Sequence, residues 1–162
     1  MTELLFGLAF PLAAPFWALM ILLPGWRWTR RIVGSPLIVL PVLAVYVAAV
    51  APILPQFAAE MLDPDLAGVR AVLDSADGTA TVWAHLIAFD LFIGRWMYLD
   101  ARERGIHPLV MAPVLVLTIL LAPLGLLVFL ALRLVVGVRG ERATSAVGSP
   151  QNSAGVHLTP DP

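Results

Sequence analysis

The sequence predicts an all-α integral membrane protein: a four-helix bundle of proline-bent helices, with a short amphipathic interfacial helix between the second and third helices. Three observations lead to this prediction. Of the 162 residues, 60% are hydrophobic and 13% are charged, whereas soluble domains have about 45 to 50% and about 25%. Apolar stretches of membrane-spanning length recur along the chain. Tryptophan and arginine gather at the ends of these stretches, as they do at membrane interfaces.

The residue types that the chain lacks exclude several kinds of chemistry. There is no cysteine, which excludes disulfides, thiolate metal ligands and a catalytic thiol. Every basic residue is arginine, so no lysine amine is available to form a Schiff base. The net charge is -1 and no basic run occurs, so nucleic acid is not expected as a partner. The composition specifies neither a cofactor nor an oligomeric state.

The first predicted helix covers residues 4–23, which contain no charge and would extend about 30 Å, the thickness of the hydrocarbon core. Residues 24–31 follow with two tryptophans and three arginines, a pattern typical of a cytoplasmic loop. The second helix is predicted over residues 32–54. Ser35 and Pro36 form a possible cap and first-turn pair, which would delay its start by a turn.

Residues 55–80 form the only sizeable hydrophilic loop, and they are acidic apart from Arg70. An acidic loop is expected outside the cytoplasm. Asp63 and Pro64 have the pattern of a cap and first helical residue. Apolar residues then follow at helical spacing on one face, which predicts the short interfacial helix: Leu66, Val69, Val72 and Leu73.

The third helix is predicted over residues 81–99 and ends in a charged segment, residues 100–107, where Gly105 is the expected C-cap. The fourth is predicted over residues 108–135, because about 30 apolar residues are too many for one level span and too few for two. We therefore expect one tilted helix, bent around Pro123.

The remaining residues complete the domain division. Residues 1–142 form the predicted transmembrane domain, and residues 143–162 are polar and small, which predicts a disordered tail. Arginine counts place the segments 24–31 and 100–107 in the cytoplasm and both termini outside. The arginines after the fourth helix oppose this orientation, because they would then face outward.

Asp90 is the most informative polar residue, because it falls at the middle of the third helix. A carboxylate at that depth costs about 2.5 to 3.5 kcal/mol on insertion scales. It must therefore face the bundle interior, carry a proton or find a partner. The two readings are a proton-handling acid and a hydrogen bond between helices. Tyr46 and Thr118 are expected at similar depth, which predicts a polar layer of these three residues.

His85, Phe89, Phe92 and Trp96 share one face of the third helix. Such a stripe is typical of helix packing, but it could also form the wall for a long polyene, with His85 as its polar end. Arg95 and Trp96 lie near the inner interface, where they could anchor the helix or bind a substrate ring. No metal site is predicted, because the acidic and histidine side chains lack the spacing of helical metal ligands.

Several segments resemble a known family. They are residues 15–31, Ser35–Leu37, the segment from His85 to Ile106, and Pro123–Gly125 with its leucine-rich continuation. Together they are similar to the abscisic-acid-deficient-four-like family over about residues 4–135. The resemblance implies a small four-helix membrane protein, long classed as a domain of unknown function. Its plant members are required in plastids for making neoxanthin from violaxanthin, and it provides no established catalytic residues.

Two functions remain open at this point. In one, the protein binds or isomerises a carotenoid or other isoprenoid in the bilayer, with Asp90 as acid, His85 as base, and Phe89, Phe92 and Trp96 positioning the substrate. In the other it is a non-catalytic pigment-binding or assembly scaffold. A transporter is less favoured, because no polar path is evident. The first helix begins at residue 4 without a transit-peptide-like extension, so we expect a bacterial plasma membrane and lipids as neighbours.

Overall fold

The computed structural model describes residues 1–147, which form helices joined by short turns, with no strand among them. The all-α prediction is confirmed. In chain order the helices, with η for 3-10 helices, are α1 (Thr2–Leu22), α2 (Arg27–Gly34), η1 (Pro36–Val39), α3 (Leu40–Val50), η2 (Ala51–Ile53), α4 (Leu54–Leu62), α5 (Leu66–Asp74), α6 (Ala76–Glu103), α7 (Pro108–Leu120) and α8 (Ala122–Val147).

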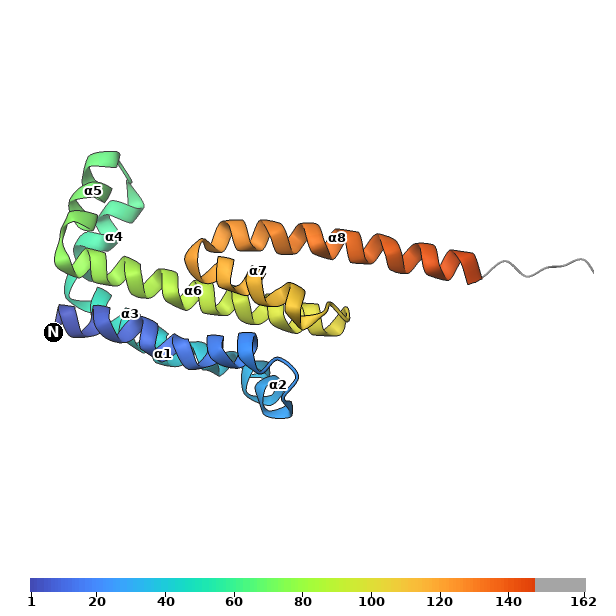
Figure 1. The fold of residues 1–162 in the computed structure, drawn as a ribbon. Helices are drawn as coiled ribbons and strands as arrows, with labels where there is room; N and C mark the ends of the chain where they lie inside the picture. The colour runs from blue at the N-terminus through green and yellow to red at the C-terminus, as the bar shows by residue number, and fades with distance from the viewer. Residues whose placement is uncertain (148–162) are drawn as a thin grey trace, which may run out of the picture.

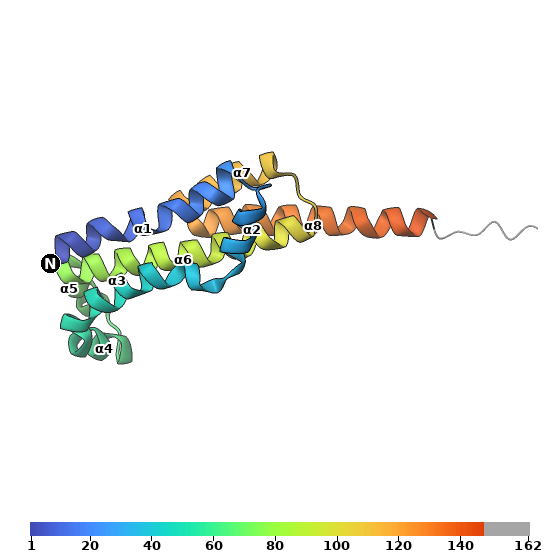
Figure 2. The ribbon, with the colours of Figure 1, turned by 90° about the horizontal axis from the view of Figure 1, so that it is seen from below.

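Helix α6 is the centre of the fold, and α1 and α3 lie along it (Figures 1 and 2). Small residues on α6 let both helices approach closely. Gly94 is required at one such contact, because a Cβ there would overlap the ring of Trp17 in α1. The core between the three helices consists of buried apolar side chains, among them Ala9, Ala13, Trp17, Val42, Val45, Ala84, Ala88 and Leu91.

The second apolar segment begins later than residue 32. Helix α2 occupies Arg27–Gly34, so most of the predicted 24–31 loop is helical. The chain turns at Ser35, whose hydroxyl accepts a hydrogen bond from the Leu37 N–H at 3.3 Å. The expected Ser35 and Pro36 pair is confirmed. Among the described residues, Pro36–Leu62 and Thr2–Leu22 are the two segments long and apolar enough to cross a membrane, by length and composition.

Helices α4 and α5 fold across one end of the bundle (Figure 1). The predicted interfacial helix corresponds to α5, but its cap is Asp65 and not Asp63. The Asp65 carboxylate accepts hydrogen bonds from the backbone N–H groups of Ala67 (2.7 Å) and Gly68 (2.9 Å). An N-cap residue does this because the N–H groups of the first helical turn have no partner within the helix. Only part of the predicted apolar face packs inward, because Val72 is buried and Leu66 is 88% exposed.

Helix α6 extends past the predicted 81–99 at both ends. Its first turn is capped by the Ser75 hydroxyl, which accepts from the Gly78 N–H at 3.0 Å. At its other end Gly105 adopts a φ of 67°, and the Ile106 N–H donates to the Ala101 carbonyl at 2.9 Å. This geometry is that of a glycine helix stop, so the predicted role of Gly105 is confirmed.

Residues 108–135 do not form the predicted single bent helix. Helix α7 ends at Leu120, Leu121 leaves helical geometry (φ −148°, ψ 74°), and α8 turns back along α7 (Figure 1). Gly125 makes this return possible, because a Cβ there would overlap the side chain and backbone of Thr118. The apolar stretch is thus a hairpin of two helices, and hydropathy alone does not distinguish this hairpin from one long helix.

The hairpin determines toward which end of the molecule α8 runs. Helix α8 leads back to the end of the molecule that holds α2 and the α6–α7 turn, while α1 starts at the opposite end (Figures 1 and 2). Four simple spans would have returned the chain to the end at which α1 starts, so that expectation is corrected. Helix α8 continues to Val147, so residues 143–147 of the predicted disordered tail are helical. The rest of that prediction, residues 148–162, lies outside the described residues.

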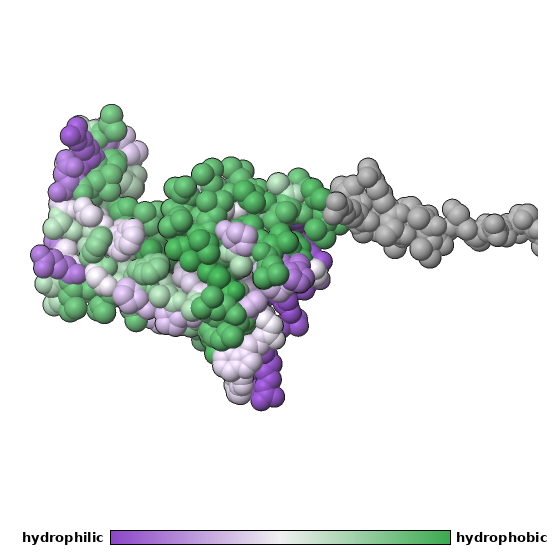
Figure 3. Space-filling view, viewed as in Figure 1, coloured by the Kyte–Doolittle hydropathy of each residue, from purple (hydrophilic) through white to green (hydrophobic). Residues whose placement is uncertain are grey.

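Polar and apolar side chains are separated along the length of the molecule. Figure 3 shows the most hydrophilic residues around α4, α5 and the N-terminus at one end, and around α2 and the end of α6 at the other. Hydrophobic side chains cover much of the surface between them. Many large apolar side chains in this band are exposed, including Leu8, Phe10, Leu40, Val47, Leu127 and Val128.

Candidate functional site

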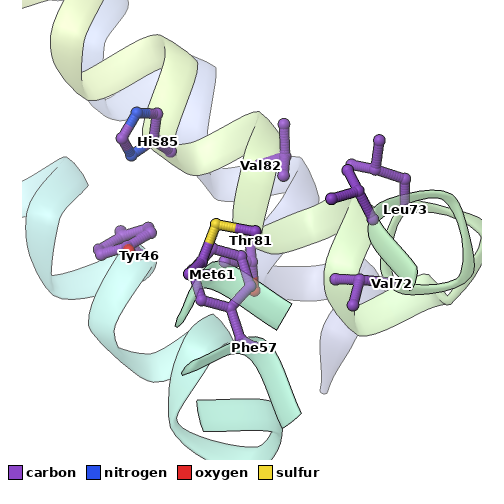
Figure 4. A pocket seen from close by; sticks show the side chains of 9 residues that line it. Tyr46, Phe57, Met61, Val72, Leu73, Thr81, Val82 and His85 are labelled. Atoms are coloured by element: carbon purple, nitrogen blue, oxygen red, sulfur yellow. The ribbon is translucent and has the colours of Figure 1, made fainter. Parts of the chain in front are cut away.

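A cavity of about 270 Å³ lies where α4 and α5 fold over α3 and α6 (Figure 4). Tyr46 of α3 and the α6 residues Thr81 and His85 form one part of its wall. The other part is apolar and comes largely from the two short helices: Phe57, Met61, Val69, Val72, Leu73 and, from α6, Val82. The cavity is therefore almost entirely hydrophobic, with three polar side chains at its α3–α6 wall.

A second depression of about 350 Å³ lies on the same two helices. Its lining is wholly apolar and comes from η1, α3 and α6: Pro36, Val39, Leu43, Ala88, Phe89 and Phe92. The His85 ring stacks on Phe89 with a centroid distance of 4.6 Å, and Phe89 belongs to this second depression. We call the two depressions together the α3–α6 groove.

His85 links the two depressions, because it lines the first and its ring stacks on Phe89 of the second. Its ring also faces Tyr46 across the helices, at a centroid distance of 5.7 Å and an angle of 58°, as Figure 4 shows. Among residues 1–136, whose side chains the structure describes, no hydrogen bond involves the His85 ring or the Tyr46 hydroxyl. Both groups are therefore available to a molecule in the groove.

Thr81 is a site residue that the sequence reasoning missed. Its side chain is 1% exposed, and its hydroxyl has no hydrogen-bond partner among the described residues. An unsatisfied buried hydroxyl costs about 1 to 3 kcal/mol, so a polar group in the cavity could gain from meeting it. The available signal was its position one helical turn before His85, which places both side chains on the same face of α6.

Asp90 does not share the groove with His85. Five residues along an α-helix correspond to a rotation of about 140°, so the two side chains point to different sides of α6. Trp83, two turns before Asp90 on its own face, stacks on Phe6 of α1 at 5.3 Å. Asp90 is thus on the side of α6 that turns toward α1. The predicted acid–base pair of Asp90 and His85 is not assembled at one place.

The predicted polar layer of Asp90, Tyr46 and Thr118 is not formed either. Thr118 is fully buried, and its hydroxyl donates to the Val114 carbonyl at 2.8 Å, with the Met97 sulfur at 3.8 Å. Tyr46 faces His85 on the other side of α6. No hydrogen bond in the part of the chain with described side chains, residues 1–136, joins Asp90 to either residue. Similar depth along separate helices did not bring these side chains together, because depth does not fix the direction in which a side chain points.

Arg95 lies away from the groove and holds α2 in place. Its guanidinium donates from Nε to the Val33 carbonyl at 2.7 Å and from Nη2 to the Gly34 carbonyl at 2.5 Å. These carbonyls end α2 and lack helical partners, so a cation is favourable there. Tyr98 supports the same junction by donating to the Pro24 carbonyl at 2.8 Å. Of the two readings for Arg95, anchoring agrees with these contacts.

Trp96 packs against α8. Its ring meets Phe129 edge-on at 5.4 Å, and the Arg133 guanidinium lies 5.7 Å from its centroid. One turn further along both helices, Arg133 also reaches Asp100 at 3.5 Å. Trp96 is therefore part of the α6–α8 contact. The other three residues of the stripe, His85, Phe89 and Phe92, line the groove.

Among residues 1–136 no group of three histidine or acidic side chains is placed to hold a metal ion. The fold and site together define a class of protein: all-helical, with two membrane-length apolar helices and an apolar groove beside a histidine.

The chain belongs to the ABA DEFICIENT 4-like family, which residues 4–129 match. It is 31% identical over 99 residues to "Protein ABA DEFICIENT 4, chloroplastic" of Arabidopsis thaliana. That match covers 57% of this chain and 45% of the plant protein, so the chain spans less than half of that relative's length. No solved structure matches the chain.

Proposed function

We propose that the protein is embedded in a membrane, with α1, the η1–α3 segment and α6 crossing it and the α7–α8 hairpin entering and leaving on one side. The hydrophobic band between two hydrophilic ends supports this placement (Figure 3). So do the exposed leucine, valine and phenylalanine side chains in that band, because a water-soluble protein rarely exposes so large an apolar surface.

The hairpin also removes the conflict in the arginine counts. With α7 and α8 entering and leaving on one side, Arg133 of α8 lies at the same end as α2 and the charged end of α6. The acidic segment around α4 and α5 lies at the other end. By the positive-inside tendency, the arginine-rich end faces the cytoplasm, in a bacterial plasma membrane, and the N-terminus of α1 faces outward.

Within this frame we propose that the α3–α6 groove binds a carotenoid or another long isoprenoid. The single observation that carries this proposal is the arrangement of two depressions along α3 and α6, linked by the stacked rings of His85 and Phe89. The wholly apolar depression lies on the same helices as the cavity that Thr81, Tyr46 and His85 line. A rigid polyene would lie against Phe89 and Phe92, and its end would reach the polar side chains.

Membership in the ABA DEFICIENT 4-like family supports a pigment-related role. The geometry favours binding over the acid–base isomerisation first considered, because Asp90 and His85 lie on different sides of α6. If the protein also catalyses a reaction in the groove, its proton transfers must use His85, Tyr46 or Thr81. A pigment-binding scaffold needs only the groove.

The test is pigment retention by the intact protein. The full chain is produced in a carotenoid-making bacterial host, purified in a mild detergent, and its pigment is extracted and quantified per mole of protein. Leu43→Trp should fill the groove and lower the retained pigment at least ~10-fold, which corresponds to about 1.4 kcal/mol of binding free energy. Leu127→Trp is the matched control, because Leu127 is 62% exposed on α8, outside the groove lining.

Equal pigment in the two variants, or a wild-type protein that carries none, would overturn the proposal. Thermal unfolding of both variants is measured in parallel, so that a folding defect in Leu43→Trp is recognised. Leu43→Met, which keeps the volume of the side chain nearly constant, should restore the pigment.

A further inference from the structure

We propose that α2 carries a binding site for the phosphate headgroup of an anionic membrane lipid. This helix of eight residues contains Arg27, Arg30 and Arg31, and all three side chains are exposed. The inference depends on the membrane placement proposed above and is independent of any ligand in the groove.

The site itself is formed by two arginines and one tryptophan. The guanidinium carbons of Arg27 and Arg31 lie 5.6 Å and 5.4 Å from the ring centre of Trp28. Together the three side chains line a surface depression of about 280 Å³. Cation–π contacts of this kind hold guanidinium groups at defined positions. Two guanidinium groups on one depression offer several N–H donors to a phosphate.

Within residues 1–136, these three arginines form no ion pair. Elsewhere in residues 1–147, Arg70 pairs with Asp74 at 3.6 Å, and Arg104 and Arg133 both pair with Asp100. No carboxylate within residues 1–136 lies within ion-pair distance of Arg27, Arg30 or Arg31. Three unpaired cations on one short helix repel each other, so an anion that joins them is stabilising.

Helix α2 is held firmly enough to keep this geometry. Arg95 donates to the two carbonyls that end the helix, and the Thr29 hydroxyl donates to the Leu23 carbonyl at 2.8 Å. Tyr98 fixes the preceding turn through the Pro24 carbonyl. Because these contacts order the helix before any ligand arrives, little ordering entropy remains to be lost on binding.

The surroundings of the arginines favour a lipid over a soluble anion. Next to the cations the chain exposes large apolar or aromatic side chains: Leu22 (73%), Leu23 (50%), Trp26 (48%) and Ile32 (36%). A phosphate at Arg27 and Arg31 would place acyl chains beside these residues. Tryptophan and arginine together are typical of the headgroup level of a bilayer, and basic segments there attract anionic lipids.

The experiment compares lipids on the full chain purified in a nonionic detergent. Short-chain phosphatidylglycerol and phosphatidylcholine are titrated separately, and bound lipid is counted by native mass spectrometry. We expect saturable binding of phosphatidylglycerol and at least ~10-fold weaker binding of phosphatidylcholine. Arg27→Gln/Arg31→Gln should weaken phosphatidylglycerol binding at least ~10-fold, whereas Arg70→Gln, at the opposite end of the molecule, should not change it.

Several outcomes would overturn the inference. These are phosphatidylglycerol binding that is the same in the double variant, displacement of the lipid by inorganic phosphate at equal concentration, and displacement by an acidic peptide. Arg27→Lys/Arg31→Lys keeps the charge but loses the planar fork, so intermediate affinity is expected, and this variant serves if the glutamine variant unfolds. Pigment retention is measured on the same preparations. It should be unchanged, so failure at α2 is distinguishable from failure of the groove proposal.

Discussion

The two halves of α6 are packed in different ways. In the first half, His85 and Phe89 are exposed on a groove, and Thr81 leaves a hydroxyl without a partner among the described residues. In the second half, Gly94 meets a tryptophan ring and Arg95 holds the end of α2. The α7–α8 hairpin packs on the second half and leaves the groove uncovered. One continuous helix thus combines an open binding surface with a closely packed anchor.

The difference between the two halves shows that a short segment rich in polar residues does not have to form a single functional site. The segment from His85 to Ile106 contains nearly all the polar residues of the apolar helices, and they point to different neighbours. His85 faces the groove and Asp90 points away from it, while Arg95, Tyr98 and Asp100 hold other helices in place. Substitutions should therefore divide into those that change ligand binding and those that change folding.

The largest effect is expected at the anchor, from Gly94→Val. Its added side chain would overlap Trp17, which is 3% exposed and has little room to move. Overpacking of this kind costs about 1 to 3 kcal/mol or more, so most of the protein should fail to elute as a monodisperse peak. Gly7→Ala is the control, because a Cβ there meets nothing within 4 Å. Equal thermal stability of the two variants would contradict the close packing described here.

Arg95→Gln should have the next largest effect. It removes the charged donors to the Val33 and Gly34 carbonyls, and hydrogen bonds to charged groups contribute about 1.5 to 3 kcal/mol. The free energy of unfolding should fall by about that amount, while pigment per folded protein stays constant. Arg70→Gln removes an exposed pair at the other end, which is worth at most about 1 kcal/mol. Loss of pigment without loss of stability in Arg95→Gln would assign Arg95 to the site instead.

Much of the anchor and the helix positions could be predicted from the sequence, because their signals are local. Long stretches without charged residues predicted α1 and the apolar segment after α2. Ser35 and Gly105 are recognisable as helix caps from their immediate sequence neighbours. The hairpin at Leu121 had no such signal. It depends on a contact between Gly125 and Thr118 that exists only when α8 turns back.

The groove was harder to predict than the helices that form it. The stripe of His85, Phe89 and Phe92 was visible, but the sequence could not show that α4 and α5 would fold over Tyr46 and close the pocket. The only sequence signal for Thr81 was its position one helical turn before His85, which does not show that its hydroxyl is buried. For Asp90 the depth was predictable and the direction was not, because direction depends on which helices flank α6.

The comparison of His85 with Asp90 tests the division between the two sides of α6. His85→Ala removes a ring that lines the cavity, and an aromatic contact between that ring and the pigment would contribute about 0.5 to 1.5 kcal/mol beyond burial. Retained pigment should fall about 2- to 10-fold. Asp90→Asn should leave it unchanged, because Asp90 points away from the groove. A larger pigment loss in Asp90→Asn than in His85→Ala, at equal stability, would restore Asp90 as a functional acid.

The smallest effect is expected from Thr81→Val, and its sign depends on the ligand. Without pigment, the substitution replaces an unpartnered buried hydroxyl by a methyl group of similar size, so thermal stability should rise by about 1 kcal/mol or less. With a pigment that carries a hydroxyl on its end ring, the same substitution removes a hydrogen bond and the stabilisation by ligand should decrease. A hydrocarbon carotene without that hydroxyl should bind both proteins equally. Melting curves with the two pigments therefore distinguish a polar pocket end from a purely apolar one, and equal curves for wild type and variant with the hydroxylated pigment would exclude Thr81 from binding.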